Sequence, residues 1–385
     1  MAIIRMDSRG TRRSCRRVRV QRERSALMQA EVHDRKRYAE TVNPTTTDGR
    51  DIDTSIGTLS GEAAEQEAKR EAEQVEQISP KPWTRVPSVE QESPTYYDRP
   101  LLKESVWSVD IPLYYYAGGA AGAALALGAA VQASGGGRDL RGFAQQCHWM
   151  GVVGSSVGAA FLIHDLGRPE RFLFMLRVFR PTSPMNLGAW ILSGAAPTAI
   201  ATALFINRRG LLGWLGESAG YASGVFGAAL ASYTGVLVAN SAVPVWQEAR
   251  RWMPPLFASS AIASAAAILD LFDNPRRAKS IVQVFGTVGR VGEVAVARMV
   301  ESSASRIARV GEPLHRGASA KLWKVAKVLT AASLVVTFIP GKSRGKRRLA
   351  AVLATAGSLC LRFAVHYVTN ASARDPRASF EQQRH

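Results

Sequence analysis

Apolar residues are concentrated in the last three quarters of the chain. Residues 1–110 contain no long apolar run, whereas apolar runs of roughly 20 residues, the length of α-helix that crosses a bilayer, recur from residue 111 onward. The pattern predicts helices near residues 113–131, 143–163, 184–206, 220–242, 256–272, 278–310, 322–339 and 349–368. We therefore expect an all-α integral membrane protein with about eight transmembrane helices, forming a polytopic domain over residues 105–385.

The helix predicted over residues 278–310 differs from the others because it is amphipathic. Arg290, Glu293, Arg298 and Glu301 interrupt its apolar positions. Two interpretations stay open, since the segment can either span the membrane at its start or lie flat on the surface.

The most charged connection, HDLGRPERFLFMLRVFRPTSPMNLGAW (residues 164–190), joins two predicted spans. Gly167 can end the preceding helix in a left-handed conformation, and Ser183 followed by Pro184 is a favourable N-cap and first helical residue for the next. Between them, phenylalanines alternate with arginines, which predicts a short amphipathic helix in the membrane interface. Arg177 and Arg180 are expected to hold lipid phosphates.

Aromatic residues occur beside several span ends. Three consecutive tyrosines, residues 114–116, begin the first span, and VPVWQEARRWMPP (residues 243–255) separates the fourth and fifth spans. Because amphipathic rings favour the membrane interface, we expect these tyrosines at its mouth and the second segment to be a turn with interfacial tryptophans.

The polar tail, residues 1–104, begins with a basic arm and continues as an acidic, Pro-rich stretch. It cannot bury an apolar core, so we expect it to be largely disordered or to fold on a partner. Residues 1–38 lack the apolar core of a signal peptide, and translation can start at either Met1 or Met28.

The net charge of +18 comes from the membrane half, because the basic arm and the acidic stretch of the tail cancel. Arginines in loops beside spanning helices indicate contact with anionic membrane lipid and argue against nucleic acid as a partner. The distribution of these arginines weakly favours cytoplasmic termini.

The three cysteines, Cys15, Cys147 and Cys360, lie far apart in the sequence and form no CxxC motif. They predict neither a zinc site, an iron–sulfur cluster nor a disulfide within this chain. We expect no bound haem either. A b-type haem would require His366 opposite His148 or His164, because the latter two are separated by about 24 Å along one helix.

Several motifs resemble the NrfD/PsrC family, the membrane subunits of polysulfide and nitrite reductase type complexes. They are DLGRPERF, MLRVFRPTSPMNLGAW, SYTGVLVANSAVPVW, GRVGEVA and RFAVHYVTNASARDPR, and the resemblance covers roughly residues 105–385. The sixth helix is unusually charged for the family, and the entrance to the first helix, VWSVDIPLYYY, also departs from its pattern.

The resemblance implies eight helices in two four-helix bundles, within a multi-pass protein of the bacterial inner (cytoplasmic) membrane. It implies binding of quinone or quinol, either menaquinone or ubiquinone, as a substrate. It also implies a ferredoxin-like iron–sulfur partner subunit that connects to a catalytic subunit, which in this family is often molybdopterin-dependent. A chain of this kind is not catalytic on its own.

Tyr233 is the first candidate for quinone binding, because in the resembled family a tyrosine of the fourth helix contacts the quinone headgroup. The alternative is a tyrosine that is hydrogen-bonded to a neighbouring helix. Tyr115 and His148 are further candidates for the quinone site.

Ionisable groups within spans suggest proton relays or ion pairs. Asp165 and His164 end the second span, and Asp165 can pair with Arg168 three residues later while the chain stays helical. Glu293 and Arg290 are expected to form an internal ion pair, with a proton path through the second bundle as the alternative.

Three hypotheses follow. The first is a quinone-interacting subunit of an oxidoreductase complex, which exchanges electrons with an iron–sulfur subunit, with or without coupled proton movement. The second is a proton or solute conduit without redox chemistry. The third is a membrane anchor for an iron–sulfur subunit. The sequence leaves open the terminal substrate, the direction of electron flow, the quinone type, proton translocation and the topology.

Overall fold

The computed structural model describes residues 101–383 apart from residues 104, 106, 136 and 342, and the backbone of residues 52–53 and 58–59. The chain divides into two units, residues 1–91 and 92–385. In the first unit, β1 (Ile52–Asp53) pairs antiparallel with β2 (Thr58–Leu59). The expected disorder of residues 1–104 otherwise lies almost wholly outside the described residues.

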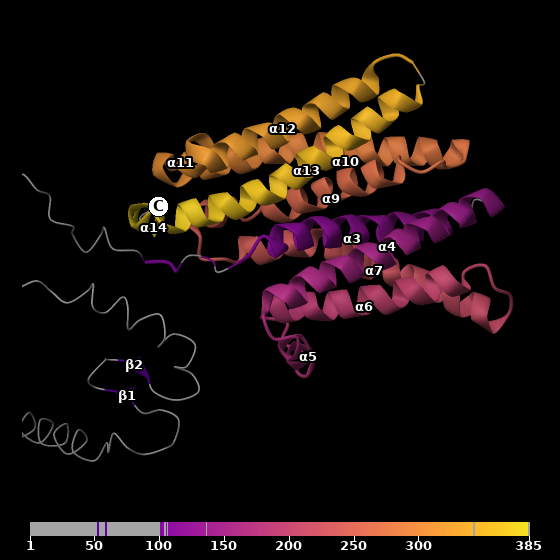
Figure 1. Cartoon of the computed structure of the whole chain (residues 1–385), viewed down its shortest axis with the longest axis horizontal. Helices are drawn as coiled ribbons and strands as arrows, with labels where there is room; N and C mark the ends of the chain where they lie inside the picture. The colour runs from indigo at the N-terminus through magenta and orange to yellow at the C-terminus, as the bar shows by residue number, and fades with distance from the viewer. Residues whose placement is uncertain are drawn as a thin grey trace, which may run out of the picture. The chain divides into compact units, whose positions relative to one another are not determined.

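The described part of the second unit is helical. Its long helices are α3 (Asp110–Ala133), α4 (Gly137–Asp165), α6 (Pro184–Phe205), α7 (Leu211–Ala239), α9 (Met253–Leu269), α10 (Arg276–Ala304), α12 (Gly317–Phe338) and α13 (Arg344–Ala373). The short helices are α5 (Glu170–Leu176), α8 (Pro244–Glu248), α11 (Ala308–His315) and α14 (Pro376–Gln383). Figure 1 shows α5, α11 and α14 toward the same end of the long helices, at the left of the picture.

Six described helices are long and apolar enough to cross a membrane: α3, α4, α6, α7, α10 and α13. α9 is apolar but has only 17 residues. The prediction of an all-helical membrane domain is therefore confirmed, and α10, whose orientation the sequence left open, has the length and composition of a span. The count of eight crossings stays a prediction.

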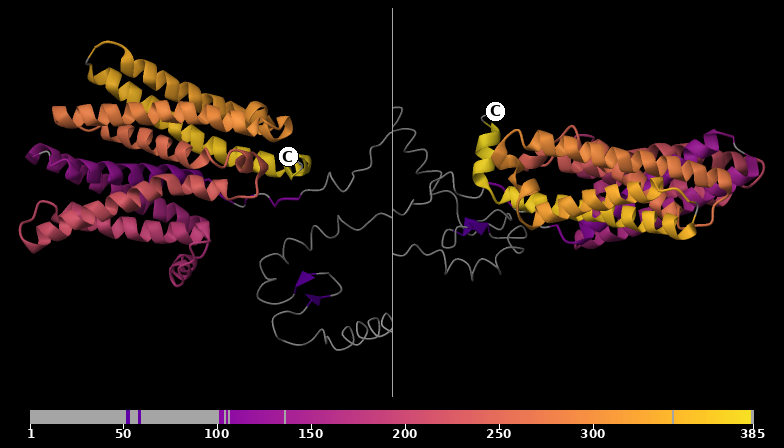
Figure 2. Two further views of the ribbon diagram at one scale, coloured as in Figure 1. Left: turned by 180° about the vertical axis from the view of Figure 1, so that it is seen from behind. Right: turned by 90° about the horizontal axis from the view of Figure 1, so that it is seen from above.

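The long helices associate in two sets of neighbours. One set consists of α3, α4, α6 and α7, and the other of α9, α10, α12 and α13. We call these the first and second helix sets. α9 also packs against α3 and α7, so it joins the two sets, and the left view of Figure 2 shows the sets side by side.

Glycines permit the closest helix contacts in the first set. A side chain on Gly122 of α3 would begin 2.5 Å from the carbonyl oxygen of Gly227 on α7. A side chain on Gly227 would in turn begin 2.6 Å from the carbonyl oxygen of Gly122. The two backbones touch here, which is the close approach that small residues allow between membrane helices.

The connection after α4 has the predicted boundaries. Gly167 adopts a left-handed conformation with φ +69°, and the hydroxyl of Ser183 caps α6 by accepting from the backbone N–H of Asn186. Between them α5 forms as a short helix with no buried residue, and Leu173 and Phe174 are exposed on it. The structure thus contains a short helix in this segment, with Arg177 and Arg180 following it. Its place in the membrane interface stays a prediction.

Several helix boundaries differ from the prediction, and two of these differences are instructive. α7 begins at Leu211 rather than near residue 220, and the helix expected over residues 278–310 ends at Ala304. Ile307 then adopts an extended conformation, with φ −109° and ψ 111°, before α11 begins. Hydropathy could not locate this break, because the amphipathic pattern continues across it.

The expectation of interfacial aromatic residues was wrong at several positions. Tyr114 and Tyr115 are buried among the helices, at 2% and 1% exposure. Trp246 lies in helix α8 rather than in a turn, is fully buried, and donates from its indole N–H to Thr369 Oγ1 at 2.8 Å. These rings fill the space where helix ends converge. The preference of aromatic residues for the membrane interface does not indicate which of them pack between helices.

Candidate functional site

A small cavity of about 60 Å³ lies where α3, α4, α6 and α7 converge near the start of α3. We call it the tyrosine cavity. Its lining is apolar apart from three tyrosines and one carboxylate, and consists of Trp107, Ile111, Tyr114, Tyr115, Leu162, Asp165, Leu166, Met175, Met185, Gly188, Ala189, Tyr233 and Leu237. Three of the candidate residues from the sequence, Tyr233, Tyr115 and Asp165, are therefore brought together.

Tyr233 enters the tyrosine cavity from α7 and is 5% exposed. Its ring lies against Gly188 of α6, where an added Cβ would overlap the phenol. Gly188 thus makes the room that the ring occupies. Within the part of the chain that the structure describes, the phenol oxygen of Tyr233 makes no hydrogen bond, so the expected alternative of a bond to a neighbouring helix is not seen there.

Tyr115 lies on α3 between the tyrosine cavity and the second helix set. Its ring meets Phe257 of α9 edge-on, with centroids 5.6 Å apart, and contacts Trp107 in the same manner at 6.5 Å. Its phenol oxygen is buried and has no hydrogen-bond partner among the described residues. A buried hydroxyl without a partner is costly, so this position can accept a water molecule or a ligand atom.

Asp165 is held by the segment that leads into α3. Its Oδ1 accepts from the backbone N–H of Ser108 at 2.9 Å and from the Ser108 hydroxyl at 2.6 Å. The neighbouring His164 pairs through Nδ1 with Oδ2 of Asp110 at 2.7 Å. These contacts join the end of α4 to the start of α3 and fix the Asp165 carboxylate at the cavity.

The ion pair expected between Asp165 and Arg168 does not form among the described residues. α4 ends at Asp165 and Gly167 then turns the chain, so the three-residue helical spacing on which the expectation rested is lost. Arg168 lies in the connection to α5 and is exposed.

His148 lies elsewhere on α4, about 26 Å along the helix from Asp165. It is fully buried, its Nδ1 lies 3.2 Å from the Ser223 hydroxyl of α7, and its Nε2 has no partner among the described residues. The structure does not bring it to the tyrosine cavity.

A second group of buried polar residues lies in the second helix set. Glu293 of α10 accepts from Thr330 Oγ1 of α12 at 2.6 Å and from Ser358 Oγ of α13 at 2.9 Å. Arg290, one turn earlier, donates to Ser333 Oγ at 2.9 Å and to the Gly286 carbonyl oxygen at 3.0 Å. The expected ion pair between Arg290 and Glu293 therefore does not form. Two hydroxyl groups from neighbouring helices bind Glu293 instead, whereas Arg290 is bound by one hydroxyl and by a carbonyl oxygen of its own helix.

Arg362 of α13 is the residue that the sequence did not single out. It is 1% exposed, its Nη2 donates to the Phe257 carbonyl oxygen at 3.1 Å, and its guanidinium lies 4.0 Å from the centre of the Phe257 ring. Its Nε and Nη1 have no partner among the described residues. Its position within an otherwise apolar span was the available signal, since ionisable residues inside membranes are rare and costly.

Asp270, which follows α9, lies at the other end of the second helix set. Burial raises the pKa of its carboxyl group, and the opposing effects of the Arg347 and Arg290 guanidinium groups are smaller. Its Oδ1 lies 3.8 Å from Nε of Arg347. Buried ionisable groups thus extend along the second helix set, whereas the first set contributes mainly tyrosines.

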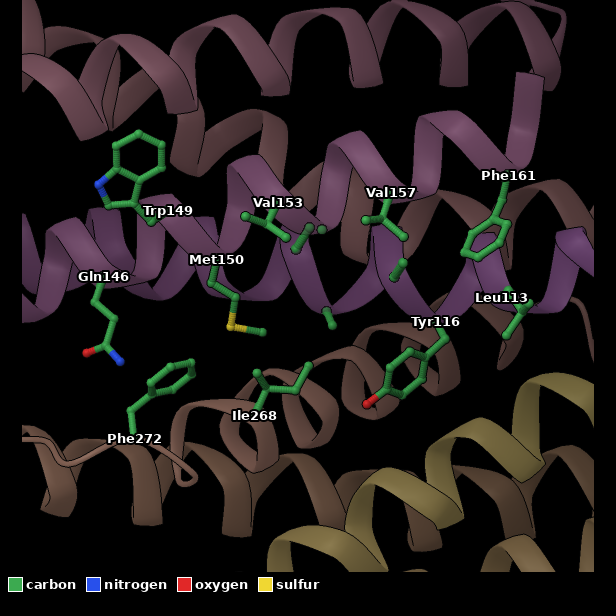
Figure 3. Close-up of a pocket in the computed structure, with 14 residues that line it drawn as sticks. Leu113, Tyr116, Gln146, Trp149, Met150, Val153, Val157, Phe161, Ile268 and Phe272 are labelled. Carbon is green, nitrogen blue, oxygen red and sulfur yellow. The ribbon is translucent and has the colours of Figure 1, made fainter. Parts of the chain in front are cut away.

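A larger groove of about 510 Å³ lies between α3, α4 and α9 (Figure 3). Figure 3 shows Leu113, Tyr116 and Phe161 at one end, and Gln146 and Phe272 at the other. Almost all of its lining is apolar, so the groove can hold a hydrocarbon chain but offers few groups to a polar ring. The tyrosine cavity is smaller but contains the hydroxyls and the carboxylate, and we therefore regard it as the candidate site.

Comparison with protein families matches residues 100–370 to the family described as polysulphide reductase, NrfD. A search of curated proteins gives no match. The family match covers most of the chain and nearly all of its helical part. The chain is a multi-pass membrane subunit of the kind that partners with other subunits in oxidoreductase complexes. It belongs to the NrfD family, as the motifs around residues 164–190 predicted.

Proposed function

We propose that this chain exchanges electrons between membrane quinone and a partner iron–sulfur subunit, with the quinone ring bound at the tyrosine cavity. The observation that carries the proposal is the phenol of Tyr233, which has no hydrogen-bond partner among the described residues and shares a cavity with the carboxylate of Asp165. Quinone reduction takes up two electrons and two protons at two carbonyl oxygens. It therefore needs a hydrogen-bond donor at a carbonyl and an ionisable group nearby.

In this proposal, Tyr233 donates a hydrogen bond to one quinone carbonyl, and Asp165 exchanges protons at that end of the membrane. Tyr115 borders the ring and adds a second phenol. At about 60 Å³ the cavity is smaller than the roughly 300 Å³ or more of typical ligand pockets. Binding therefore requires side chains at its wall to move, and Met175 and Met185 are suitable because methionine is flexible.

Electrons must come from or go to another subunit. Cys147 and Cys360 are separate free thiols, and cysteine spacing in the chain does not suit a cluster. We propose a ferredoxin-like iron–sulfur subunit as the direct partner and a catalytic subunit of the molybdopterin-dependent type beyond it. We further propose that all eight long helices cross a bacterial inner membrane as two four-helix bundles, which correspond to the two helix sets.

The test measures quinol-linked electron transfer by the assembled complex in membranes. Tyr233→Phe and Asp165→Asn should each lower turnover about tenfold or more, the equivalent of one lost hydrogen bond of about 1.4 kcal/mol. Tyr221→Phe is the matched control, because Tyr221 lies on the same helix but is half exposed. The partner subunits should co-purify with every variant. Normal turnover in both cavity variants would overturn the site, and would instead favour a membrane anchor.

We also propose that proton movement accompanies electron transfer, supported by the buried Arg290, Glu293 and Arg362 of the second helix set. Charged groups inside a membrane often mark proton or ion paths. The pH inside liposomes that contain the complex should change during quinol turnover. Glu293→Gln should lower the number of protons moved across the membrane for each electron transferred. Proton flux without any redox partner would support a conduit instead.

A further inference from the structure

A second groove, distinct from the tyrosine cavity, lies along α10 in the second helix set. It has a volume of about 750 Å³ and is formed by one side of α10, Leu334 of α12 and Trp252 before α9. Val291, Val294 and Leu334 line its apolar part, whereas Arg298, Ser302 and Arg306 line its polar part. Apolar and cationic side chains thus follow one another along a single groove.

The depth of these residues along α10 suits a membrane lipid. α10 has 29 residues and is about 43 Å long, whereas the hydrocarbon core of a bilayer is about 30 Å thick. The helix must therefore extend into the headgroup region. Arg298 lies six residues before its end, about 9 Å, and Arg306 follows the helix. Val291 lies about 10 Å from Arg298 in the opposite direction, toward the hydrocarbon.

The two arginines are not neutralised within the part of the chain that the structure describes. Glu301 lies between them in the sequence, but its Oε1 pairs with Lys327 Nζ and accepts from Trp323 Nε1. The Glu301 carboxylate is therefore neutralised by Lys327 of α12. Neither Arg298 nor Arg306 makes an ion pair with another described residue, and both are exposed.

We propose that this groove binds an anionic phospholipid, with its phosphate between Arg298 and Arg306 and its acyl chains along Val291, Val294 and Leu334. Guanidinium groups form strong, directional hydrogen bonds with phosphate oxygens, and the Ser302 hydroxyl can add another. Trp252 has the amphipathic ring that favours this depth. Free phosphate would leave the apolar part of the groove unused, so the complete ligand combines phosphate and hydrocarbon. The proposal does not depend on quinone binding.

Lipid retention can be tested by native mass spectrometry of the delipidated, detergent-solubilised full chain after addition of phosphatidylglycerol or phosphatidylcholine. The chain should bind phosphatidylglycerol preferentially. Arg298→Gln combined with Arg306→Gln should weaken its affinity about thirtyfold, since each basic group near an anionic headgroup contributes roughly fivefold. Lys321→Gln is the matched control, because Lys321 is also exposed and basic but does not line the groove.

The exposed positions of both arginines predict that the double variant folds normally, and its Tm without added lipid should equal that of the unmodified chain. Phosphatidylglycerol should raise the Tm of the unmodified chain and of Lys321→Gln more than that of the double variant. Equal binding of phosphatidylcholine, or unchanged phosphatidylglycerol affinity in the double variant, would overturn the proposal. A third outcome would also overturn the proposal. If the double variant retained phosphatidylglycerol but no longer co-purified with a partner subunit, the arginines would bind protein rather than lipid.

Discussion

The two helix sets are stabilised by different means. In the first set, Gly122 and Gly227 bring the backbones of α3 and α7 into contact, and the largest polar groups are tyrosines. In the second set, Arg290, Glu293 and Arg362 are buried between helices, and hydroxyls satisfy the carboxylate of Glu293. Close helix packing therefore positions the tyrosine cavity, whereas in the second set buried charges and hydrogen bonds add to close packing. α9, which packs against both, connects the two arrangements.

Close backbone contact occurs in both sets, since a side chain on Gly289 of α10, next to Arg290, would begin 2.5 Å from the backbone nitrogen of Ala263 on α9. The buried charges are what distinguish the second set. A buried charge inside a membrane requires polar partners on neighbouring helices, and α12 and α13 provide them as Thr330 and Ser358. Direct backbone contact, in contrast, requires the absence of side chains. Loss of a buried charge and addition of a methyl group at a close backbone contact should therefore destabilise the protein to different extents.

The largest effect is expected for Glu293→Leu. Glu293 is a buried carboxylate that accepts from the Thr330 and Ser358 hydroxyls, and its charge also acts through space on Arg290 and Arg362. Leucine removes that charge and leaves two buried donors without their acceptor, at a cost of about 1–3 kcal/mol for each unsatisfied group. We expect a marked fall in Tm measured in detergent. Glu293→Gln removes the same charge but keeps two hydrogen-bonding atoms, so it should lose less. Equal losses in the two variants would show that the charge rather than the hydrogen bonds stabilises the helices.

Gly122→Ala should have the next largest effect. The added methyl would begin 2.5 Å from the Gly227 carbonyl oxygen and 2.7 Å from the Ala231 backbone nitrogen, neither of which can rotate away. Overpacking of this kind costs about 1–3 kcal/mol. Gly142→Ala is the matched control, since no atom lies within 4 Å of its added methyl and helix propensity favours alanine. A similar Tm for the two variants would contradict close packing between α3 and α7.

Gly188→Ala tests whether shape in the first helix set serves the candidate site. The added methyl would overlap the Tyr233 ring, so the phenol must move within the cavity. We expect quinol-linked turnover to fall about tenfold, the loss of one hydrogen bond, while the partner subunits still co-purify. Turnover that stays normal although a structure of the variant shows a displaced phenol would separate Tyr233 from catalysis.

The smallest effect is expected for Thr330→Val in the second helix set. Valine has nearly the same shape as threonine and removes one of the two hydroxyls that donate to Glu293. Hydrogen bonds between membrane helices contribute about 0.6 kcal/mol on average. The fall in Tm should be small, and the Tm of Thr330→Val combined with Ser358→Ala should fall by more than the sum of the single changes if the hydroxyls act together on the carboxylate.

Hydropathy located the long helices well because each apolar run reflects its own surroundings in the membrane. It failed at α8 and at the break after Ala304, where boundaries depend on contacts with distant segments. For the same reason, only some of the candidate residues predicted from the sequence lie together in the structure. Tyr233 and Asp165 line one cavity, but His148 lies about 26 Å from Asp165 along the same helix.

By itself, the sequence determined that the chain is a helical membrane subunit and, through its motifs, to which family it belongs. These properties depend on hydrophobicity and on local patterns. Only the tertiary structure decided that Asp165 and Tyr233, 68 positions apart, share a cavity, and that hydroxyls rather than Arg290 partner Glu293. The physical reason is that a helix's own period specifies which face a residue occupies, whereas its contacts depend on which helices pack against that face.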